Sequence, residues 1–585
     1  MEKAEFSWFQ GGKTNISYNC LDRHLAEKGA QTALIFEPND PKEKAQHISY
    51  TELHARVSKM ANVLKANGIE KGDRVCIYLP MIPELAISVL ACARIGAVHS
   101  VVFAGFSATA LASRIQDCTC KLIVTADGGF RGNKEIDLKI IVDEALLSCP
   151  SITKSLVVKR TYSIINMLSG RDSYLENELQ KVSDVCEAEI MDAEDPLFIL
   201  YTSGSTGKPK GMLHSTGGYM VYAGFTFQNV FDYQEKEVFW CTADIGWITG
   251  HSYSVYGPLL NGATTVLFEG IPSYPDFGRF WEIIDKHQVN QFYTAPTAIR
   301  SLAKESLYWV EKYDLSSLRI LGSVGEPIND EAWYWYHKNI GKENCPIVDT
   351  WWQTETGGIL ISPLPNITKL KPAFATLPLA GIQVALMDET QQELIGNEVS
   401  GSLCIKFPWP SIARTIWGDH QRYLETYFTA FPGYYFTGDG ALRDEDGYYR
   451  ITGRVDDVII VSGHNLGTGP IEEAINDHPL VAESAIVGFP HDIKGSALYG
   501  FVILKEEHAD HGKLRKEINQ IISDQIGPIA KLDKIQFTSG LPKTRSGKIM
   551  RRILRKIAEG ELKNFGDIST LLNPELVAEI LKDKR

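Results

Sequence analysis

Residues 196–211 read PLFILYTSGSTGKPKG. The first seven residues are an apolar run typical of a buried strand, and the rest is a polar loop rich in glycine. The loop's three glycines allow tight turns and expose backbone N–H groups, and its hydroxyl and ammonium groups add further donors. These polar side chains are Thr202, Ser203, Ser205, Thr206, Lys208 and Lys210. A strand that ends in such a loop predicts a binding site for a polyphosphate.

This loop differs from a Walker phosphate loop. Its glycines are spaced differently, and Pro209 stands where a Walker loop has the Ser or Thr that binds magnesium. A flexible Gly/Ser turn is the alternative interpretation, but such a turn has no need of two lysines, four hydroxyls and a preceding buried strand together. We therefore expect a phosphate site of another kind.

Apolar runs alternate with helix-like stretches on the N-terminal side of this loop. The runs are RVCIYLP (74–80), AVHSVVFA (97–104) and KLIVTA (121–126), and the clearest helical pattern is YTELHARVSKMANVLKANG (50–68). This alternation is typical of βαβ units. It predicts an α/β fold with a large N-terminal domain of several subdomains, whose mostly parallel sheets are flanked by helices. The less periodic residues 160–190 are expected to connect two subdomains.

A domain boundary is predicted near GRVDD (453–457). Before it lies a series of short strands and turns, with Asp446-Gly447 suited to a hairpin. After it the pattern is that of a small α+β domain. We therefore predict an N-terminal domain over 1–455 and a small, mobile C-terminal lid domain over 456–585.

Composition argues against several classes of partner. The net charge of −13, from 59 basic and 72 acidic residues, argues against nucleic acid and anionic membranes as partners. The N-terminus lacks the apolar core of a signal peptide. The longest apolar stretch, residues 83–106, is interrupted by Arg94 and His99, so a helix that runs into a buried strand is expected instead of a membrane span. A cytoplasmic protein is the prediction.

Ten cysteines are scattered along the chain. Cys118 and Cys120 are close enough in sequence to ligate a metal together, but two reduced thiols are the simpler interpretation.

The loop at 201–211 resembles the phosphate loop of the adenylate-forming superfamily, which includes acyl-CoA synthetases, luciferases and peptide-synthetase adenylation domains. Further motifs of that superfamily follow in the same order: GEP (325–327), DTWWQTETG (349–357), YFTGD (435–439), GRVDD (453–457) and PKTRSGK (542–548). Longer stretches resemble the acetate-activating branch, namely ADIGWITGHSY (243–253), FYTAPTAIR (292–300), ILGSVGEPIN (320–329) and DTWWQTETGG (349–358). The resemblance implies two-step activation of acetate, with ATP and coenzyme A as co-substrates.

The resemblance also implies a nucleotide site. Its members are Thr202, Ser203, Gly204, Ser205, Thr206, Gly207, Lys208, Gly325, Glu326, Pro327, Asp349, Thr350, Trp351, Trp352, Gln353, Thr354, Asp439, Arg454 and Asn465. Asp439 can accept both ribose hydroxyls, Arg454 can reach the ribose or the α-phosphate, and Thr354 can bond the α-phosphate. Glu355 would hold Mg²⁺ against the phosphates.

Lys548 is expected to be catalytic. A fixed ammonium between the acid and the α-phosphate stabilises the charge of the transition state, and it needs no covalent intermediate. The alternative is a surface basic helix, because several basic residues surround Lys548. Acetylation would remove this charge, so a lysine acetyltransferase and a deacetylase are possible partners acting on Lys548.

The resemblance places the acid pocket at Ile248, Thr249, Val324 and Trp352. The Trp352 indole would fill the space of a longer acyl chain and leave room for about one methyl group. Propionate remains the alternative acid, because one methylene in an apolar pocket changes binding by only ~1–3 kcal/mol.

The same resemblance assigns a coenzyme A site and a hinge. The coenzyme A residues are Arg131, Gly132, Asn133, Lys134, Thr249, Ser273, Ser462 and Ser523. Asp456 is the expected hinge for rotation of the C-terminal domain between the two steps. A second cation site is suggested at Asn476, His478 and Val481.

Three positions depart from the family pattern. Asn465 stands where an Arg is expected, Gly469-Pro470 replaces Ala-Glu, and Ser523 stands where relatives often have an Arg for coenzyme A. A nucleotide-binding relative without turnover is therefore a further alternative.

Overall fold

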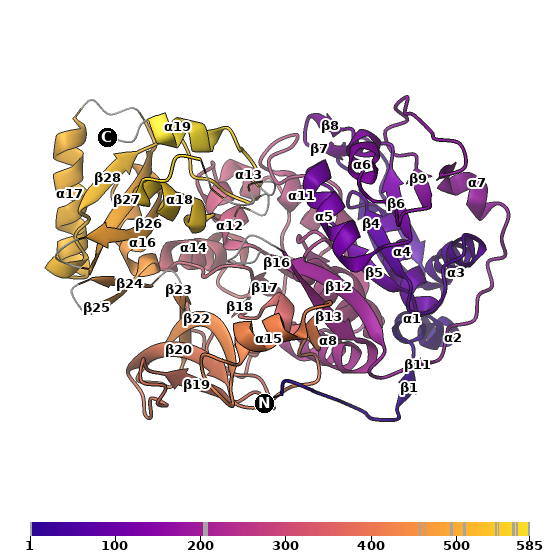
Figure 1. The fold of residues 1–585 in the computed structure, drawn as a ribbon, viewed down its shortest axis with the longest axis horizontal. Helices are drawn as coiled ribbons and strands as arrows, with labels where there is room; N and C mark the ends of the chain where they lie inside the picture. The colour runs from indigo at the N-terminus through magenta and orange to yellow at the C-terminus, as the bar shows by residue number, and fades with distance from the viewer. Residues whose placement is uncertain are drawn as a thin grey trace. The chain divides into compact units, whose positions relative to one another are not determined.

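The computed structural model describes most of the chain. The described residues are 3–202, 209–455, 458–461, 464–491, 495–506, 510–544, 547, 549–563, 565, 568 and 571–582. They form two compact units (Figure 1). Unit 1 comprises the residues up to 202 with 209–384 and 405–435, and unit 2 comprises 385–404 with the residues from 436 onward. The predicted boundary at 455/456 stays a prediction, because Asp456 lies outside the described residues.

The first large sheet of unit 1 has eight strands. Their order is β10 (Asp172–Tyr174), β9 (Lys154–Val158), β6 (Leu122–Ala126), β4 (Arg74–Tyr78), β5 (Val98–Val101), β12 (Pro196–Thr202), β13 (Lys210–Ser215) and β21 (Thr415–Ile416). The pairs from β10 to β12 are parallel, whereas β13 and β21 pair antiparallel. The four strands predicted from the apolar runs are therefore confirmed.

The expectation that residues 160–190 connect two subdomains is wrong. This segment contains β10 and the short helix α7 (Leu175–Leu179), and β10 pairs with β9 in the same sheet that continues to β12. The sequence of β10 is the polar triplet DSY, half-buried at the sheet edge. Because an edge strand of three residues shows no apolar alternation, its pattern looks like a loop.

The second large sheet of unit 1 has seven strands. Their order is β18 (Ile347–Asp349), β17 (Ile320–Ser323), β16 (Gln291–Thr294), β14 (Val238–Cys241), β15 (Thr264–Phe268), β2 (Thr32–Glu37) and β3 (Gln46–Ser49). Only the β2–β3 pair is antiparallel among these. Parallel strands place the segments that follow them at one edge of the sheet, where ligands bind in open α/β folds.

Helices pack against both sheets of unit 1. The main ones are α3 (Tyr50–Ala66), α4 (Pro83–Arg94), α5 (Ala108–Cys118), α6 (Leu138–Leu146), α8 (Thr216–Val230), α11 (Arg279–His287), α12 (Pro296–Ala303), α14 (Asp330–Trp335) and α15 (His420–Tyr427). The predicted helix over 50–68 is confirmed as α3. It begins with a capping box, in which Ser49 and Glu52 satisfy each other's backbone N–H groups.

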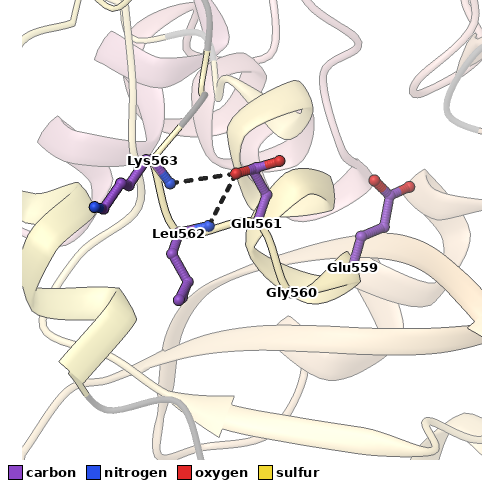
Figure 2. A pocket seen from close by; sticks show the side chains of 5 residues that line it. All are labelled: Glu559, Gly560, Glu561, Leu562 and Lys563. Atoms are coloured by element: carbon purple, nitrogen blue, oxygen red, sulfur yellow. Dashed lines mark hydrogen bonds between the residues drawn. The ribbon is translucent and has the colours of Figure 1, made fainter.

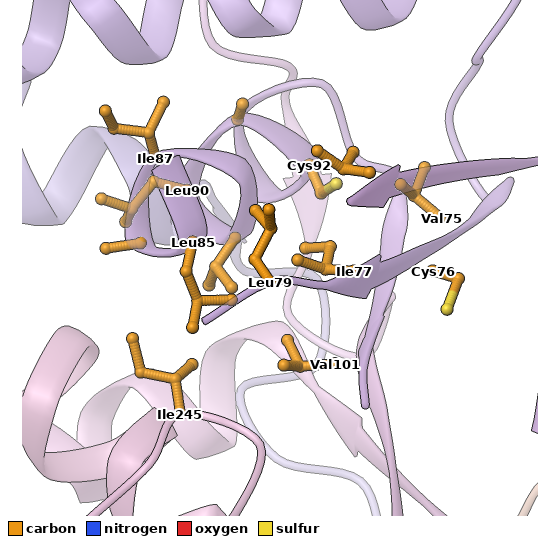
Figure 3. Close-up of a cluster of buried hydrophobic side chains, with 14 of the residues drawn as sticks. Val75, Cys76, Ile77, Leu79, Leu85, Ile87, Leu90, Cys92, Val101 and Ile245 are labelled. Atoms are coloured by element: carbon orange, nitrogen blue, oxygen red, sulfur yellow. The ribbon is translucent and has the colours of Figure 1, made fainter. Parts of the chain in front are cut away.

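The apolar stretch at 83–106 forms α4 followed by β5, as the interrupted pattern predicted. Every residue of α4 except Glu84 is buried, and its side chains lie with those of β4 and β5 in one cluster (Figure 3). Within the described part of the chain, no helix combines the length and the apolar character needed to cross a membrane.

Unit 2 contains two smaller sheets. One has the order β19 (Val384–Met387), β20 (Val399–Ile405), β22 (Tyr435–Arg443) and β23 (Tyr449–Arg454). The other has β25 (His464–Gly467), β24 (Val458–Val461), β27 (Gly495–Leu504) and β26 (Val481–His491), with β28 (Lys534–Phe537) also pairing with β27. The hairpin predicted at Asp446-Gly447 is confirmed, since it joins β22 to β23 and Gly447 has φ +80°.

Helices cover the five-stranded sheet of unit 2 on both faces. They are α16 (Thr468–Asn476), α17 (His511–Gln525), α18 (Arg551–Glu559) and α19 (Leu576–Lys582). Along β26, Ile486 joins the cluster of α16 and α17, whereas Ala485 and Val487 join that of α18 and α19. This alternation gives the sheet two buried faces. The predicted fold class is confirmed: a large α/β part with mostly parallel sheets and a smaller α+β part.

Candidate active site

The ends of the glycine-rich loop are held together by two paired strands. Thr202 ends β12, Lys210 begins β13, and the two residues are register partners. The predicted phosphate residues between them, Ser203, Gly204, Ser205, Thr206, Gly207 and Lys208, lie outside the described residues.

The segments that follow β17 and β18 lie at the same edge of the seven-stranded sheet. Ser323 and Asp349 are register partners, and the Thr350 N–H donates to the Ser323 carbonyl at 3.0 Å. The predicted adenine segment Gly325–Pro327 and the predicted phosphate segment 349–354 are therefore neighbours. Gly325 has φ +97°, which favours glycine, and the Glu326 carboxylate pairs with Arg300 at 2.9 Å.

The turn that carries Thr354 and Glu355 is held by side chains outside the motif. His214 Nε2 donates to the Thr354 carbonyl at 2.8 Å, and Ser252 Oγ donates to the Gly357 carbonyl at 2.9 Å. The Thr356 carbonyl accepts two further bonds, from Trp409 Nε1 at 2.9 Å and Ser411 Oγ at 2.6 Å. Because these donors are buried and directional, they fix the backbone from which the Thr354 and Glu355 side chains project.

His214 is an uncharged hydrogen-bond donor in this site. A carbonyl only accepts, so Nε2 carries the hydrogen. Burial lowers the pKa of His214 to about 4, against a smaller opposing effect of the bond to Thr354. The imidazole therefore remains an uncharged donor at neutral pH.

Glu355 belongs to a buried polar network with Lys210 and Tyr427. The Tyr427 hydroxyl donates to Glu355 Oε1 and accepts from Lys210 Nζ at 2.7 Å. Lys210 Nζ lies 3.8 Å from Glu355 Oε1. Burial raises the pKa of Tyr427 well above its ordinary value, so the hydroxyl keeps its hydrogen. A carboxylate on a fixed turn suits Mg²⁺, which takes few protein ligands and completes its shell with phosphate and water.

The predicted acid-pocket residues all lie in unit 1. Ile248, at the start of α9 (Ile248–Gly250), and Trp352 pack on the same buried cluster. Trp352 Nε1 donates to the Tyr293 hydroxyl at 3.2 Å, and the Tyr253 ring stands edge-on to the indole, with centroids 5.0 Å apart. Val324 is buried directly after β17. Thr249, on α9, is half-buried.

Two predicted ribose ligands pair with each other in unit 2. Asp439 and Arg454 are register partners on β22 and β23, and Arg454 Nη1 lies 3.3 Å from Asp439 Oδ1. Thr437 supports both: its hydroxyl accepts from the Asp439 N–H at 3.0 Å, and its carbonyl accepts from Arg454 Nη1 at 3.1 Å. Arg454 is the more exposed partner, with 41% of its side chain accessible.

The predicted coenzyme A cations lie side by side on a small hairpin. Arg131 ends β7 (Gly129–Arg131), Lys134 begins β8 (Lys134–Ile136), and the two are register partners. Asn39 makes two bonds to Gly132 between them, each of 2.8 Å, one through its amide nitrogen and one through its amide oxygen. Gly132 is buried, whereas Arg131, Asn133 and Lys134 are exposed. Ser273 is exposed in unit 1, and Ser523 is half-buried on α17 of unit 2.

Comparison with known proteins places this geometry in a family. Residues 21–417 match the model of the AMP-binding enzyme, and residues 470–548 match the AMP-binding enzyme C-terminal domain. The acetyl-coenzyme A synthetase of Syntrophobacter fumaroxidans is 59% identical over 584 residues, which cover 100% of this chain and 89% of that protein. Acetyl-coenzyme A synthetase 2 of Pseudomonas aeruginosa is 57% identical, with 100% and 90% covered. The chain belongs to the acetyl-coenzyme A synthetase family.

A solved structure of similar fold is available for comparison. The acetoacetyl-CoA synthetase from Streptomyces lividans superposes with a TM-score of 0.90 at 24% sequence identity, covering 98% of this chain and 87% of that one. At this level of identity the match concerns the fold alone.

Several residues that the family resemblance selects lie outside the described part of the chain. These are Lys548, Ser462 and Asp456, and of Asn465 only the backbone is described, in β25. Their roles stay predictions. At the suggested second cation site, Asn476 Oδ1 accepts from Ser484 Oγ at 2.9 Å. The imidazole of His478 accepts from the Leu480 N–H at 3.2 Å, and Val481 is buried.

Cys118 and Cys120 are buried, with their sulfur atoms 3.2 Å apart. Their mutual hydrogen bond and burial raise the pKa of Cys118 well above its ordinary value. The thiol form is favoured, in agreement with the simpler of the two interpretations.

A surface hollow lies directly after α18. It is lined by Glu559, Gly560, Glu561, Leu562 and Lys563 (Figure 2). Glu561 Oε1 accepts there from the N–H groups of Leu562 and Lys563, at 3.2 and 3.4 Å. No residue of the predicted site contributes to it.

Seven side chains that the sequence does not predict support the motif residues. Some donate hydrogen bonds to the backbone of a motif, and the others bond to a side chain of a motif. The seven are Asn39, His214, Ser252, Tyr293, Trp409, Ser411 and Tyr427. Ser252 and Tyr293 lie within stretches that the resemblance singles out, ADIGWITGHSY and FYTAPTAIR, so the sequence contains a signal for these two residues.

Proposed function

We propose that this protein is an AMP-forming acetate:CoA ligase. Acetate attacks the α-phosphate of ATP, giving acetyl-AMP and pyrophosphate. The thiol of coenzyme A then attacks the acetyl carbon, releases AMP and gives acetyl-CoA. The observation that carries this proposal is identity of 57–59% with acetyl-coenzyme A synthetases over the whole of this chain.

The geometry of unit 1 supports the first step. The base of the phosphate loop is held by β12 and β13, and the adenine and α-phosphate segments follow neighbouring parallel strands. Lys548 would deliver the ammonium that stabilises the five-coordinate phosphorus. Mg²⁺ would be held by Glu355, and it would neutralise phosphate charge.

The second step needs coenzyme A. The Arg131/Lys134 hairpin offers two cations for its phosphate end, with Thr249, Ser273, Ser462 and Ser523 along the remaining path. Rotation of the C-terminal domain about Asp456 would move Lys548 out of the site after the first step, and it would bring in the residues that bind coenzyme A for the second. We further propose a cytoplasmic location, and control of Lys548 by a lysine acetyltransferase and a deacetylase.

Trp352 supports acetate over propionate as the acid. Its indole fills the position where a longer chain would extend. Because one methylene changes transition-state binding modestly, we expect propionate to be a roughly 10–200-fold poorer substrate.

Acid-dependent exchange of pyrophosphate into ATP tests the proposal. Formate, acetate, propionate and butyrate are compared with the wild type and with Lys548→Ala, and thioester formation is followed from ATP and from preformed acetyl-AMP. We expect acetate to give the highest kcat/KM, and the variant to lose exchange while still converting acetyl-AMP. A higher kcat/KM for propionate would identify a propionate ligase. Tight ATP binding without any exchange would identify a relative without turnover.

A further inference from the structure

A buried chain of hydrogen bonds runs from the Trp352 indole to the backbone of β17. The Tyr293 hydroxyl lies 3.2 Å from Trp352 Nε1 and 2.6 Å from Thr350 Oγ1. Thr350 Oγ1 donates in turn to the Ser323 carbonyl at 2.8 Å. Tyr293, Thr350 and Ser323 are all buried. The chain thus links Trp352, in the predicted acid pocket, to β17, which lies beside the edge strand β18 of the seven-stranded sheet.

The direction of every bond in this chain is determined. An indole N–H only donates and a carbonyl only accepts. Tyr293 therefore accepts from Trp352 and donates to Thr350, and Thr350 donates to Ser323. Burial holds the pKa of Tyr293 well above its ordinary value, so the hydroxyl keeps the hydrogen that the chain requires. A satisfied buried chain of this kind favours one side-chain arrangement.

The Tyr293 ring itself has little room to move. Gly322 is its register partner on β17, and a Cβ added there would lie 2.5 Å from Tyr293 Cδ2. The ring of Phe231 stands edge-on at 4.8 Å between centroids, and that of Tyr253 at 5.8 Å. Tyr253 also stands edge-on to Trp352, so its ring packs against both Tyr293 and Trp352 and limits the movement of both.

We propose that Tyr293 is a positioning residue that determines acid specificity, because its hydroxyl holds the Trp352 indole in place as the floor of the pocket. The Trp352 indole excludes one extra methylene only if it keeps its position when a longer acid binds. An indole released from its hydrogen bond could shift within the pocket and admit a longer acid at little cost. The inference rests on the proposed function, which makes Trp352 the floor of an acetate pocket.

Tyr293→Phe tests the inference because it removes the hydroxyl and keeps the ring. We expect the ratio of kcat/KM for acetate over propionate to fall about three- to tenfold, chiefly through a lower KM for propionate. The kcat for acetate should change less than twofold. Binding is measured independently by inhibition with unreactive alkyl esters of AMP, and the propyl ester should gain affinity relative to the ethyl ester.

Thr350→Val is the second variant, since it removes the hydroxyl that accepts from Tyr293 and tests the same chain of bonds if Tyr293→Phe fails to fold. The ratio for acetate over propionate should fall in it as well, and because both acids use the same nucleotide site, any effect on ATP cancels in this ratio. Tyr50→Phe is the matched control. The Tyr50 hydroxyl is equally buried and donates to the Ala263 carbonyl at 2.8 Å, away from the pocket residues, so its removal should leave the ratio unchanged.

Trp352→Gly separates this inference from the proposed function. If Trp352→Gly accepts longer acids but Tyr293→Phe keeps the wild-type ratio and the wild-type ester inhibition, the role of Tyr293 is overturned and the acetate pocket stands. If Trp352→Gly fails to accept longer acids, the pocket assignment fails and the inference fails with it.

Discussion

At the level of single residues, the Glu355 carboxylate is constrained before any nucleotide arrives. Tyr427 donates to it, and Lys210 lies close enough to offset its charge. A carboxylate with an ammonium 3.8 Å away has reduced attraction for a free divalent cation. We therefore expect the metal to enter together with ATP, whose phosphates supply the remaining charge.

Tyr427→Phe should weaken the use of magnesium in the first step. Without the hydroxyl, Glu355 loses one donor and its direct pairing with Lys210 tightens. We expect the free Mg²⁺ concentration for half-maximal pyrophosphate exchange to rise several-fold, with a roughly tenfold lower kcat, in line with loss of a charge-assisted bond of about 1.5–3 kcal/mol. Exchange rates at varied free Mg²⁺ measure this, and electron paramagnetic resonance of Mn²⁺–ATP reports metal binding directly.

Tyr423→Phe is the control for this experiment. Tyr423 lies on the same helix and is fully buried, but its hydroxyl donates to the Ala413 carbonyl at 2.6 Å. Its removal should leave the magnesium dependence as in the wild type. An unchanged magnesium dependence in Tyr427→Phe would refute the role assigned to Tyr427.

Buried histidines should make the fold sensitive to acid. Burial lowers the pKa of both His214 and His251 to about 4. Unfolding returns such a histidine to a pKa of about 6.5, so the unfolded chain binds more protons between these values and stability falls as the pH drops from about 6.5 towards 4. Each histidine is expected to cost about 2 kcal/mol at pH 5 relative to pH 8.

His251→Asn tests this dependence. The substitution removes the titrating ring and keeps a donor towards the Trp247 carbonyl, which His251 Nδ1 approaches to 3.4 Å. We expect lower stability at pH 8 but a smaller loss between pH 8 and pH 5, measured as the shift of the urea midpoint. His511→Asn, at an exposed position on α17, should retain the wild-type loss. An undiminished loss in His251→Asn would contradict the expectation.

At the level of elements, the β7–β8 hairpin depends on a residue far away in the sequence. Its two strands have three residues each, too few to hold their geometry without support. Asn39 supplies that support through its paired bonds to Gly132. The uncharged side chain of Asn39 therefore fixes the positions of Arg131 and Lys134, the two cations predicted to bind a phosphate.

Asn39→Ala should impair coenzyme A binding selectively. The hairpin loses two bonds and the two cations lose their alignment, so we expect the KM for coenzyme A to rise about tenfold, the equivalent of one or two neutral hydrogen bonds. Acetate-dependent pyrophosphate exchange should remain within twofold of the wild type. Asn62→Ala is the control, because Asn62 also makes two bonds to backbone carbonyls, those of Ser183 and Val185. Equal effects on exchange and on the KM would show that Asn39 has a general structural role.

At the level of the whole molecule, an acidic protein places individual cations at the predicted anion-binding positions. The net charge is −13, yet Lys210, the Arg131/Lys134 pair and Arg454 each stand at a predicted anion-binding position. Each of these cations comes from a strand end or a hairpin, where backbone pairing limits its movement. The proposed chemistry therefore needs local placement of cations and no overall basic charge.

Local patterns in the sequence were sufficient for much of the fold. The strands β4, β5 and β6 follow from the short apolar runs at 74–80, 97–104 and 121–126, and α3 follows from its periodicity and its Ser49/Glu52 cap. These features depend on residues a few positions apart, which is the range over which secondary structure is decided. The polar edge strand β10 was missed because its position comes from pairing with β9 and not from its own pattern.

The sequence by itself determined the family, the order of the motifs and the residue types that the chemistry requires. Only the tertiary structure decided which side chains hold those motifs in place. Tyr293 lies 59 residues from Trp352, Tyr427 lies 72 residues from Glu355, and His214 lies 140 residues from Thr354. Tyr293 lies in a stretch that the family resemblance singles out, but the stretch does not show which side chain it contacts. Hydrogen bonds in a buried site are made across strands and helices that come together only when the whole unit folds.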